Sequence, residues 1–185
     1  MKSLFYSLLL LVTTATAQES ESSSVKELLF EPNDTARNRD VPVKLYLPAD
    51  LDSPAPVILF SHGLGGSRMN SVYLGRHWAE HGYACVFMQH IGSDESVWKD
   101  ARPGERMSAM KAAASLKSTL DRFADVPFVL DQLELWNADE RHPTYGKLDL
   151  EHIGMCGHSF GAVTTQAMMG QQFRGGRTAS DPRLD

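Results

Sequence analysis

Short apolar segments alternate with polar, glycine-containing turns from residue 25 onward. Five of these segments are predominantly apolar and four to seven residues long, which is typical of strands. They span residues 25–30, 41–47, 56–60, 83–89 and 153–156. The first two are separated by a short polar turn, so we expect them to run antiparallel.

Segments with the apolar spacing of helices lie between the later predicted strands. Residues 69–81 carry aromatic and apolar side chains on one side and end at Gly82, a residue that suits a left-handed helix cap. A longer helical region has apolar residues at helical spacing from Val126, and Pro127 is expected in its first turn. A last helix is predicted over 162–171. This alternation predicts an α/β fold, a mostly parallel sheet of five strands flanked by helices.

The amino terminus has the pattern of a signal peptide. Lys2 is followed by the apolar stretch 4–12 and by the small residues 15–17, a typical cleavage site. A short buried helix is the alternative, but the polar stretch that follows favours export, to the periplasm or the medium. The predicted organisation is a signal peptide at 1–17, a flexible leader at 18–24 and a partial hydrolase-like domain at 25–185.

Composition and charge exclude several classes of protein. The formal net charge is −5, with 42% hydrophobic and 22% charged residues, so no basic surface indicates a nucleic-acid partner. Beyond the amino terminus no apolar run is long enough to span a membrane. The two cysteines, Cys85 and Cys156, lie in apolar strand-like segments, where a buried free thiol is more usual than a disulfide.

The pentapeptide Gly157–Gly161 follows the last predicted strand and precedes a predicted helix. A Gly-x-Ser-x-Gly sequence in this context is a nucleophile elbow, a sharp turn that exposes the serine hydroxyl at the carboxyl edge of a sheet. Gly157 and Gly161 allow the strand and the helix to pack closely. Ser159 is therefore the candidate nucleophile.

A second glycine-containing segment, residues 61–66, follows the third predicted strand and is called the glycine loop below. Acyl transfer passes through a tetrahedral intermediate whose negative oxygen is stabilised by backbone N–H groups. We expect these N–H groups to come from Leu64 in the loop and Phe160 in the elbow. The supporting residues of the loop are predicted to be His62, Gly63 and Gly65. A simple turn between strand and helix is the alternative for the loop alone.

Three segments carry a family resemblance: the glycine loop with Phe60, residues 89–96 and residues 157–162. With them the sequence resembles α/β-hydrolases, and more narrowly the secreted bacterial branch related to platelet-activating factor acetylhydrolases, chlorophyllases and proteins described as dienelactone hydrolases. The resemblance covers nearly all of residues 25–185. It implies that the strand before the glycine loop lies beside the elbow strand. Dienelactone hydrolases proper use a cysteine nucleophile, so Ser159 argues against that chemistry.

The catalytic acid and histidine of such a hydrolase follow the serine in sequence, but no histidine follows Ser159. The resemblance therefore predicts an incomplete chain, with later strands, acid and histidine beyond residue 185, and a fragment nearly inactive by itself. Upstream substitutes for the base are His158, His90 and His62. His90 is instead expected to shape the pocket, and His62 to hold the loop by hydrogen bonds.

The predicted function is hydrolysis of carboxylic esters with lipid-like or short acyl groups, with a small ester as the partner molecule. Trp98 and His90 are candidate substrate contacts. No cofactor is predicted, and no residue spacing indicates a metal site. Two alternatives remain open from the sequence: a serine peptidase of the same fold and a hydrolase-like protein that binds a ligand without catalysis.

Overall fold

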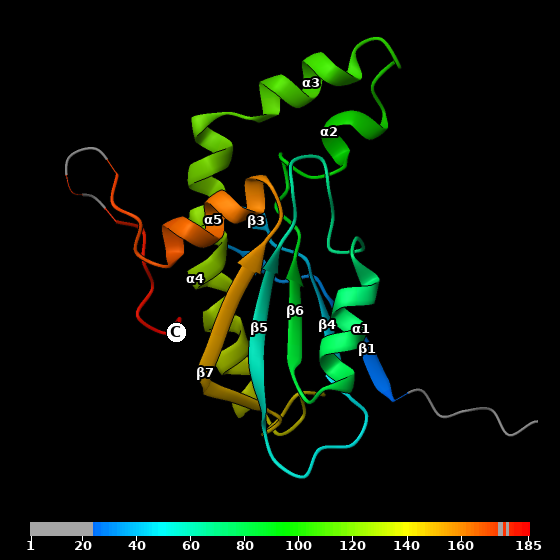
Figure 1. Cartoon of the computed structure of the whole chain (residues 1–185), viewed down its shortest axis with the longest axis vertical. Helices are drawn as coiled ribbons and strands as arrows, with labels where there is room; N and C mark the ends of the chain where they lie inside the picture. Colours follow the sequence, from blue (N-terminus) through cyan, green and yellow to red (C-terminus); the bar gives the residue numbers. More distant parts are fainter. Residues whose placement is uncertain (1–23, 174–175, 177) are drawn as a thin grey trace, which may run out of the picture.

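The computed structural model describes residues 24–173, 176 and 178–185. The predicted signal peptide and residues 18–23 of the predicted leader lie outside these residues, so export stays a prediction. A central sheet forms the body of the molecule, and the segment that carries α2 (Ser96–Lys99) and α3 (Arg106–Ala113) projects beyond the carboxyl ends of the strands (Figure 1). None of the described helices is long and apolar enough to cross a membrane.

Five strands form the main sheet in the order β1-β4-β6-β5-β7. The amino-terminal strands pair antiparallel, β1 with β4 and β4 with β6, whereas β5 lies parallel to both β6 and β7. Their bounds are β1 Val25–Phe30, β4 Val43–Pro48, β5 Ala55–Ser61, β6 Ala84–Met88 and β7 Leu148–Gly157. The turn between β1 and β4 holds a separate small hairpin of β2 (Asn33–Asp34) and β3 (Arg39–Asp40). The predicted strand positions and the α/β fold are confirmed.

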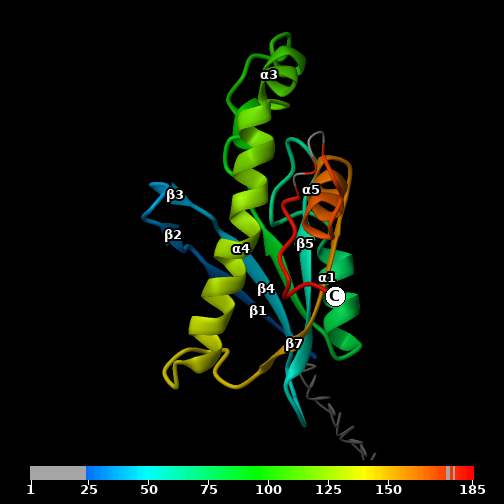
Figure 2. The same ribbon diagram turned by 90° about the vertical axis from the view of Figure 1, so that its left-hand side faces the viewer.

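The two faces of the sheet pack against different helices because successive strand residues point to opposite sides. Leu45 and Leu59 lie in a core that also contains Val126 and Leu130 of α4 (Leu116–Ala138). Residues next to them in sequence, Tyr46 and Phe60, point the other way, toward α1 (Val72–Glu80). Figure 2 shows α4 and α1 on opposite sides of the sheet. The helix after the elbow, α5 (Phe160–Met168), contributes Met168 to the core on the α4 side. The fold therefore has three layers, helix, sheet and helix.

Two helix predictions need correction. The first helix begins at Val72 rather than Met69, because Ser71 has a left-handed backbone (φ 56°) that no helix continues. Pro127 lies in the middle of α4, not in its first turn. An interior proline costs about 3 kcal/mol or more. Burying residues such as Val126, Val129 and Leu133 offsets this, at about 1.5–3 kcal/mol each.

Candidate active site

The turn between β7 and α5 places Ser159 at the carboxyl edge of the sheet. Its backbone has φ 53° and ψ −115°, a sparsely populated conformation for a residue with a side chain. Such a conformation costs about 1–3 kcal/mol and persists only where the surrounding structure imposes it. The Ser159 side chain is exposed to solvent. The elbow therefore presents a hydroxyl that an incoming molecule can reach.

The glycines of the elbow are required by close packing. A Cβ atom on Gly161 would lie 1.8 Å from the carbonyl oxygen of Ser61, the last residue of β5. A Cβ atom on Gly157 would lie 2.4 Å from the carbonyl carbon of Gly161. Any side chain at either position would push the elbow away from β5. The two glycines thus hold the turn against the strand that leads into the glycine loop.

The glycine loop and the elbow meet because β5 and β7 are parallel neighbours, with Ser61 opposite Gly157. A Cβ atom on Gly63 would lie 2.9 Å from His158 Nδ1 and 3.4 Å from Ser159 Cβ, so the two segments are in contact. Leu64, His158 and Ser159 line one cavity of about 230 Å³. Within the described part of the chain, the N–H groups of Leu64 and Phe160 have no hydrogen-bond acceptor.

Two hydrogen bonds fix the peptide group that carries the Leu64 N–H. Its carbonyl, the oxygen of Gly63, accepts from His62 Nδ1 at 2.7 Å and from the Gly66 N–H at 3.0 Å. His62 Nε2 in turn accepts from the His90 N–H at 3.1 Å. Burial lowers the pKa of His62 to about 3, so the ring is neutral and carries its proton on Nδ1. The His62 ring therefore holds the loop that displays Leu64.

The next residues of the loop are held from the segment after β6. Gly65 donates its N–H to the Ser93 carbonyl at 2.9 Å, and its own carbonyl accepts from Trp98 Nε1 at 2.7 Å. Gly65 has φ 72°, which favours glycine, and Met110 packs where a Cβ atom would be. Trp98 is half-buried. Its indole N–H supports the glycine loop, and its role as a substrate contact stays a prediction.

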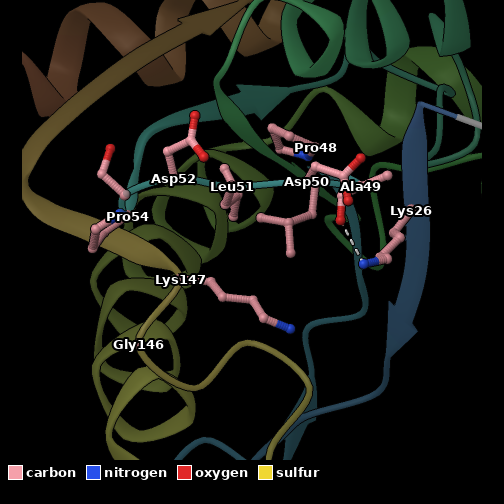
Figure 3. Close-up of a pocket in the computed structure, with 11 residues that line it drawn as sticks. Lys26, Pro48, Ala49, Asp50, Leu51, Asp52, Pro54, Gly146 and Lys147 are labelled. Carbon is pink, nitrogen blue, oxygen red and sulfur yellow. Dashed lines mark hydrogen bonds between the residues drawn. The ribbon is translucent and has the colours of Figure 1, made fainter.

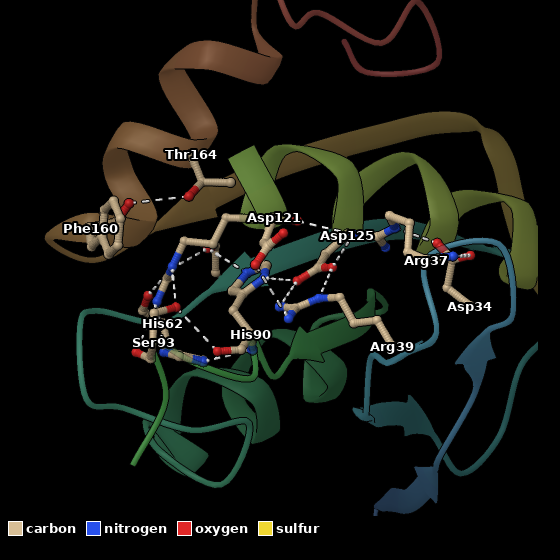
Figure 4. A network of polar contacts seen from close by, with 12 residues as sticks. Asp34, Arg37, Arg39, His62, His90, Ser93, Asp121, Asp125, Phe160 and Thr164 are labelled. Atoms are coloured by element: carbon tan, nitrogen blue, oxygen red, sulfur yellow. Dashed lines mark hydrogen bonds and ion pairs between the residues drawn. The ribbon is translucent and has the colours of Figure 1, made fainter. Parts of the chain in front are cut away.

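His90 is completely buried in this structure, which does not favour contact with a substrate, so that role stays a prediction. Its Nδ1 donates to Asp125 at 2.9 Å, and its Nε2 accepts from the Ser61 hydroxyl at 2.9 Å. Figure 4 shows His90 facing Asp125, with Arg39 beside the same carboxylate. Burial lowers the pKa of His90. The neutral ring joins the end of β5 to α4 and has no nitrogen left for a ligand.

The carboxylate of Asp125 is the centre of this buried network. It accepts from Arg37 at 2.9 Å and from Arg39 at 2.8 and 2.9 Å, as well as from His90. Burial acts to raise the pKa of Asp125, but hydrogen bonds from Arg39 and His90 hold it well below its usual range. Sequence reasoning missed Asp125 and Arg122. Both lie on the buried face of α4, Arg122 four residues before Val126 and Asp125 four residues before Val129, and that placement was the available signal.

None of the histidines forms a hydrogen bond with the Ser159 hydroxyl in the described part of the chain. His158 is exposed and packs against Gly63. His62 and His90 are buried and engaged elsewhere. Among the described residues, no group of three or more His, Cys, Asp or Glu side chains is arranged to hold a metal ion. Among the described residues, the elbow thus offers an exposed serine and two N–H groups, without a histidine bonded to the serine hydroxyl.

A larger cavity, of about 490 Å³, lies at the opposite end of the sheet (Figure 3). Pro54 and Lys147, which line it, directly precede β5 and β7. Its two lysines, Lys26 and Lys147, each donate to a backbone carbonyl at 2.6 Å. Ligands of open α/β sheets bind at the carboxyl ends of the strands. The smaller cavity at Ser159 is therefore the better candidate site.

Comparison with known proteins agrees with this fold. A family model described as platelet-activating factor acetylhydrolase, isoform II, matches residues 16–113. Among solved structures, a ferulic acid esterase from Streptomyces cinnamoneus has a TM-score of 0.59 and 19% identity over 88% of this chain and 56% of its own. A protein described as a dienelactone hydrolase from Klebsiella pneumoniae has a TM-score of 0.58 and 16% identity over 86% of this chain and 57% of its own.

A cold-adapted esterase from an Arctic intertidal metagenomic library has a TM-score of 0.52 and 19% identity, over 84% of this chain and 61% of its own. At these identities the likeness concerns the fold. The chain spans just over half the length of the first two structures. No match was found among curated protein sequences.

Proposed function

Since this chain belongs to the platelet-activating factor acetylhydrolase isoform II family of α/β-hydrolases, we propose that it is a serine carboxylic-ester hydrolase. Ser159 is the nucleophile of the proposal, and the N–H groups of Leu64 and Phe160 bind the oxyanion. One observation carries it: an exposed serine in a strained turn shares a cavity with Leu64, whose N–H has no other acceptor in the described chain.

The chemistry follows from these positions. The Ser159 oxygen attacks the carbonyl carbon of the ester while a base takes the hydroxyl proton. The carbonyl electron pair moves to oxygen, and the two N–H groups stabilise the resulting negative charge. When the carbonyl re-forms, the alcohol leaves with the proton and the acyl group stays on Ser159. Water then repeats the sequence and releases the acid.

The base and its orienting acid belong, in this proposal, to residues outside 1–185. Each histidine of the chain is buried, engaged or placed without a hydrogen bond to Ser159, as described above. Removing the histidine of a serine protease lowers turnover about a millionfold. The chain by itself is therefore expected to react at Ser159 slowly, and a small base supplied in solution should speed the reaction.

Esters with lipid-like or short acyl groups are the proposed substrates, on the strength of the family. The cavity of about 230 Å³ at Ser159 is consistent with a small acyl group, since drug-sized ligands occupy pockets of about 300–1,000 Å³. Export of the protein is proposed from the sequence of residues 1–17 alone.

Labelling with a fluorophosphonate tests the nucleophile. We expect the chain to be labelled at Ser159, identified by peptide mass spectrometry, and the rate to rise severalfold with added imidazole. Ser159→Ala should abolish labelling. Ser71→Ala is the matched control, because Ser71 lines the same cavity and also has a positive φ. Labelling that persists in Ser159→Ala, or that vanishes in Ser71→Ala alone, contradicts the assignment.

The bond that is cleaved is a separate question. Imidazole-assisted turnover of 4-nitrophenyl acetate should exceed turnover of a peptide nitroanilide. Faster amide cleavage would favour a peptidase, and labelling at Ser159 without turnover of either would favour a binding protein.

A further inference from the structure

Arg122 is a fully buried cation on α4 that has no ion-pair partner among the described residues. Its hydrogen bonds go to neutral groups instead. The guanidinium donates to the His62 carbonyl and to the Ser93 hydroxyl, each at 2.8 Å. Longer contacts of 3.4 Å reach the Ser61 hydroxyl and the Ser93 carbonyl. The carboxylates of Asp125 and Asp94 attract the charge without contacting it, but the cost of burial is larger, so the position of this cation needs an explanation beyond packing.

The guanidinium also lies over the ring of Phe160, with 4.4 Å between its central carbon and the ring centroid. Phe160 is the first residue of α5 and directly follows Ser159. A cation over an aromatic face is attracted to the ring and holds it in place. Burial lowers the pKa of Arg122 to about 10, which leaves the side chain charged at neutral pH.

These contacts join three segments that meet at the candidate site. The His62 carbonyl begins the glycine loop, and Ser93 belongs to the segment that holds Gly65. Phe160 belongs to the elbow. Figure 4 shows His62, Ser93 and Phe160 at the same end of the network, away from Arg37 and Asp34. The two segments that carry the N–H groups of the proposed oxyanion site are therefore both in contact with the Arg122 guanidinium.

We infer that Arg122 is the positioning residue of the oxyanion site: it sets the distance between the Leu64 and Phe160 amides and places a positive charge behind both. This inference rests on the proposed function of Ser159. The side chain touches neither substrate nor nucleophile. It acts through the His62 carbonyl and the Phe160 ring, and its buried charge lowers the free energy of a negative oxygen nearby.

Two substitutions separate the fork of hydrogen bonds from the charge. Arg122→Met removes both and should slow fluorophosphonate labelling of Ser159 about 10- to 50-fold, less than the 10²- to 10³-fold loss typical of deleting an oxyanion donor. Arg122→Lys keeps the charge without the fork and should slow it about threefold to tenfold. Lys117→Met is the matched control, because Lys117 lies on the same helix with its side chain 82% exposed. It should leave the rate within twofold of wild type.

Phe160→Leu removes the ring contact without deleting Arg122. This variant tests the inference if Arg122→Met folds poorly. It should slow labelling about threefold, and the effect should shrink in a chain that already carries Arg122→Met, because the two groups act together. The amide resonances of Leu64 and Phe160, followed by ¹H–¹⁵N NMR, should move in Arg122→Met. A residue that only stabilised the fold would lower the melting temperature and leave these resonances in place.

The outcomes are distinct. Labelling of wild type at Ser159 with unchanged rates in folded Arg122→Met overturns the inference and leaves the proposed function standing. No labelling of wild type at Ser159, even with imidazole, overturns the proposed function and the inference with it. Slower labelling, shifted Leu64 and Phe160 resonances and an unaffected Lys117→Met together support the role of Arg122.

Discussion

The contact between the glycine loop and the elbow predicts the effect of one methyl group at Gly63. A Cβ atom there would lie 2.9 Å from His158 Nδ1, 3.3 Å from the His158 carbonyl and 3.4 Å from Ser159 Cβ. Ordinary contacts of this kind begin at about 3.5 Å, so an overlap of about half an ångström with the ring must be relieved. If the loop yields, the Leu64 N–H moves away from the oxyanion position by a similar amount.

Such a displacement should matter more for reaction than for folding. We expect Gly63→Ala to slow fluorophosphonate labelling of Ser159 about tenfold, since an error of 1 Å can cost about a hundredfold. The free energy of unfolding, measured in urea, should fall by only about 1–2 kcal/mol, the lower range for overpacking. Gly104→Ala is the matched control, because a Cβ atom on Gly104 would meet nothing within 4 Å.

The His158 ring offers a second check on the same reasoning. The 2.9 Å contact is with its side chain, which is exposed. His158→Ala combined with Gly63→Ala should therefore restore labelling to within about threefold of wild type. Labelling of Gly63→Ala at the wild-type rate would refute the argument that this contact positions Leu64. Slow labelling of the folded double variant would refute the argument as well.

Three further predictions concern the groups beneath the site. Asp125→Asn should lower the free energy of unfolding by about 3–5 kcal/mol, because the arginines around that carboxylate would lose their buried partner; a loss under 1 kcal/mol in urea would contradict this. His62 and His90 have lowered pKa values in the fold, so the unfolded chain binds more protons below about pH 6.5. Stability should therefore fall as the pH drops from 6.5 toward 4, by about 1.4 kcal/mol per pH unit for His62, with a further loss in the same direction from His90, and a flat profile of urea midpoints would count against neutral buried rings. Trp98→Phe removes the hydrogen bond to Gly65 but keeps an aromatic ring; imidazole-assisted turnover of 4-nitrophenyl esters should slow about threefold at every acyl length, whereas a loss confined to long acyl groups would indicate substrate contact.

Local pattern was sufficient for the parts of the site that depend on neighbouring residues. The apolar segment before the glycine loop and the segment before the elbow are found as β5 and β7, side by side and parallel, as the family resemblance implied. Glycine spacing indicated close packing at Gly161, and the 1.8 Å distance to the Ser61 carbonyl supplies the reason. The two strands and the glycine spacing are each encoded within about ten residues of sequence, whereas the adjacency of the strands came from the resemblance.

Features that depend on distant residues were not predictable in this way. Asp125 and Arg122 are charged residues in a helix, which normally face water. Only the fold brings them beneath β5 and β6, where their partners lie 29 to 88 positions away in the sequence. The burial of His90 has the same origin, because the helix that covers it begins far along the chain. Pro127 was misplaced because tertiary packing outweighed a local helix preference.

The chain contains two serines whose surroundings each resemble part of a serine hydrolase, and their comparison shows what a nucleophile requires. Ser61 has the hydrogen bonds of a catalytic triad, to His90 at 2.9 Å and through it to Asp125. Yet Ser61 is fully buried, so no ester carbonyl can reach its oxygen. Ser159 has the reverse: access, a strained turn and two N–H groups without other acceptors, but no base among the described residues. A base can be supplied by another part of a protein or by solution, whereas access cannot be supplied to an interior group without unfolding. The triad-like network around Ser61 is therefore best understood as the support that holds β5 and the glycine loop in place for the serine at the surface.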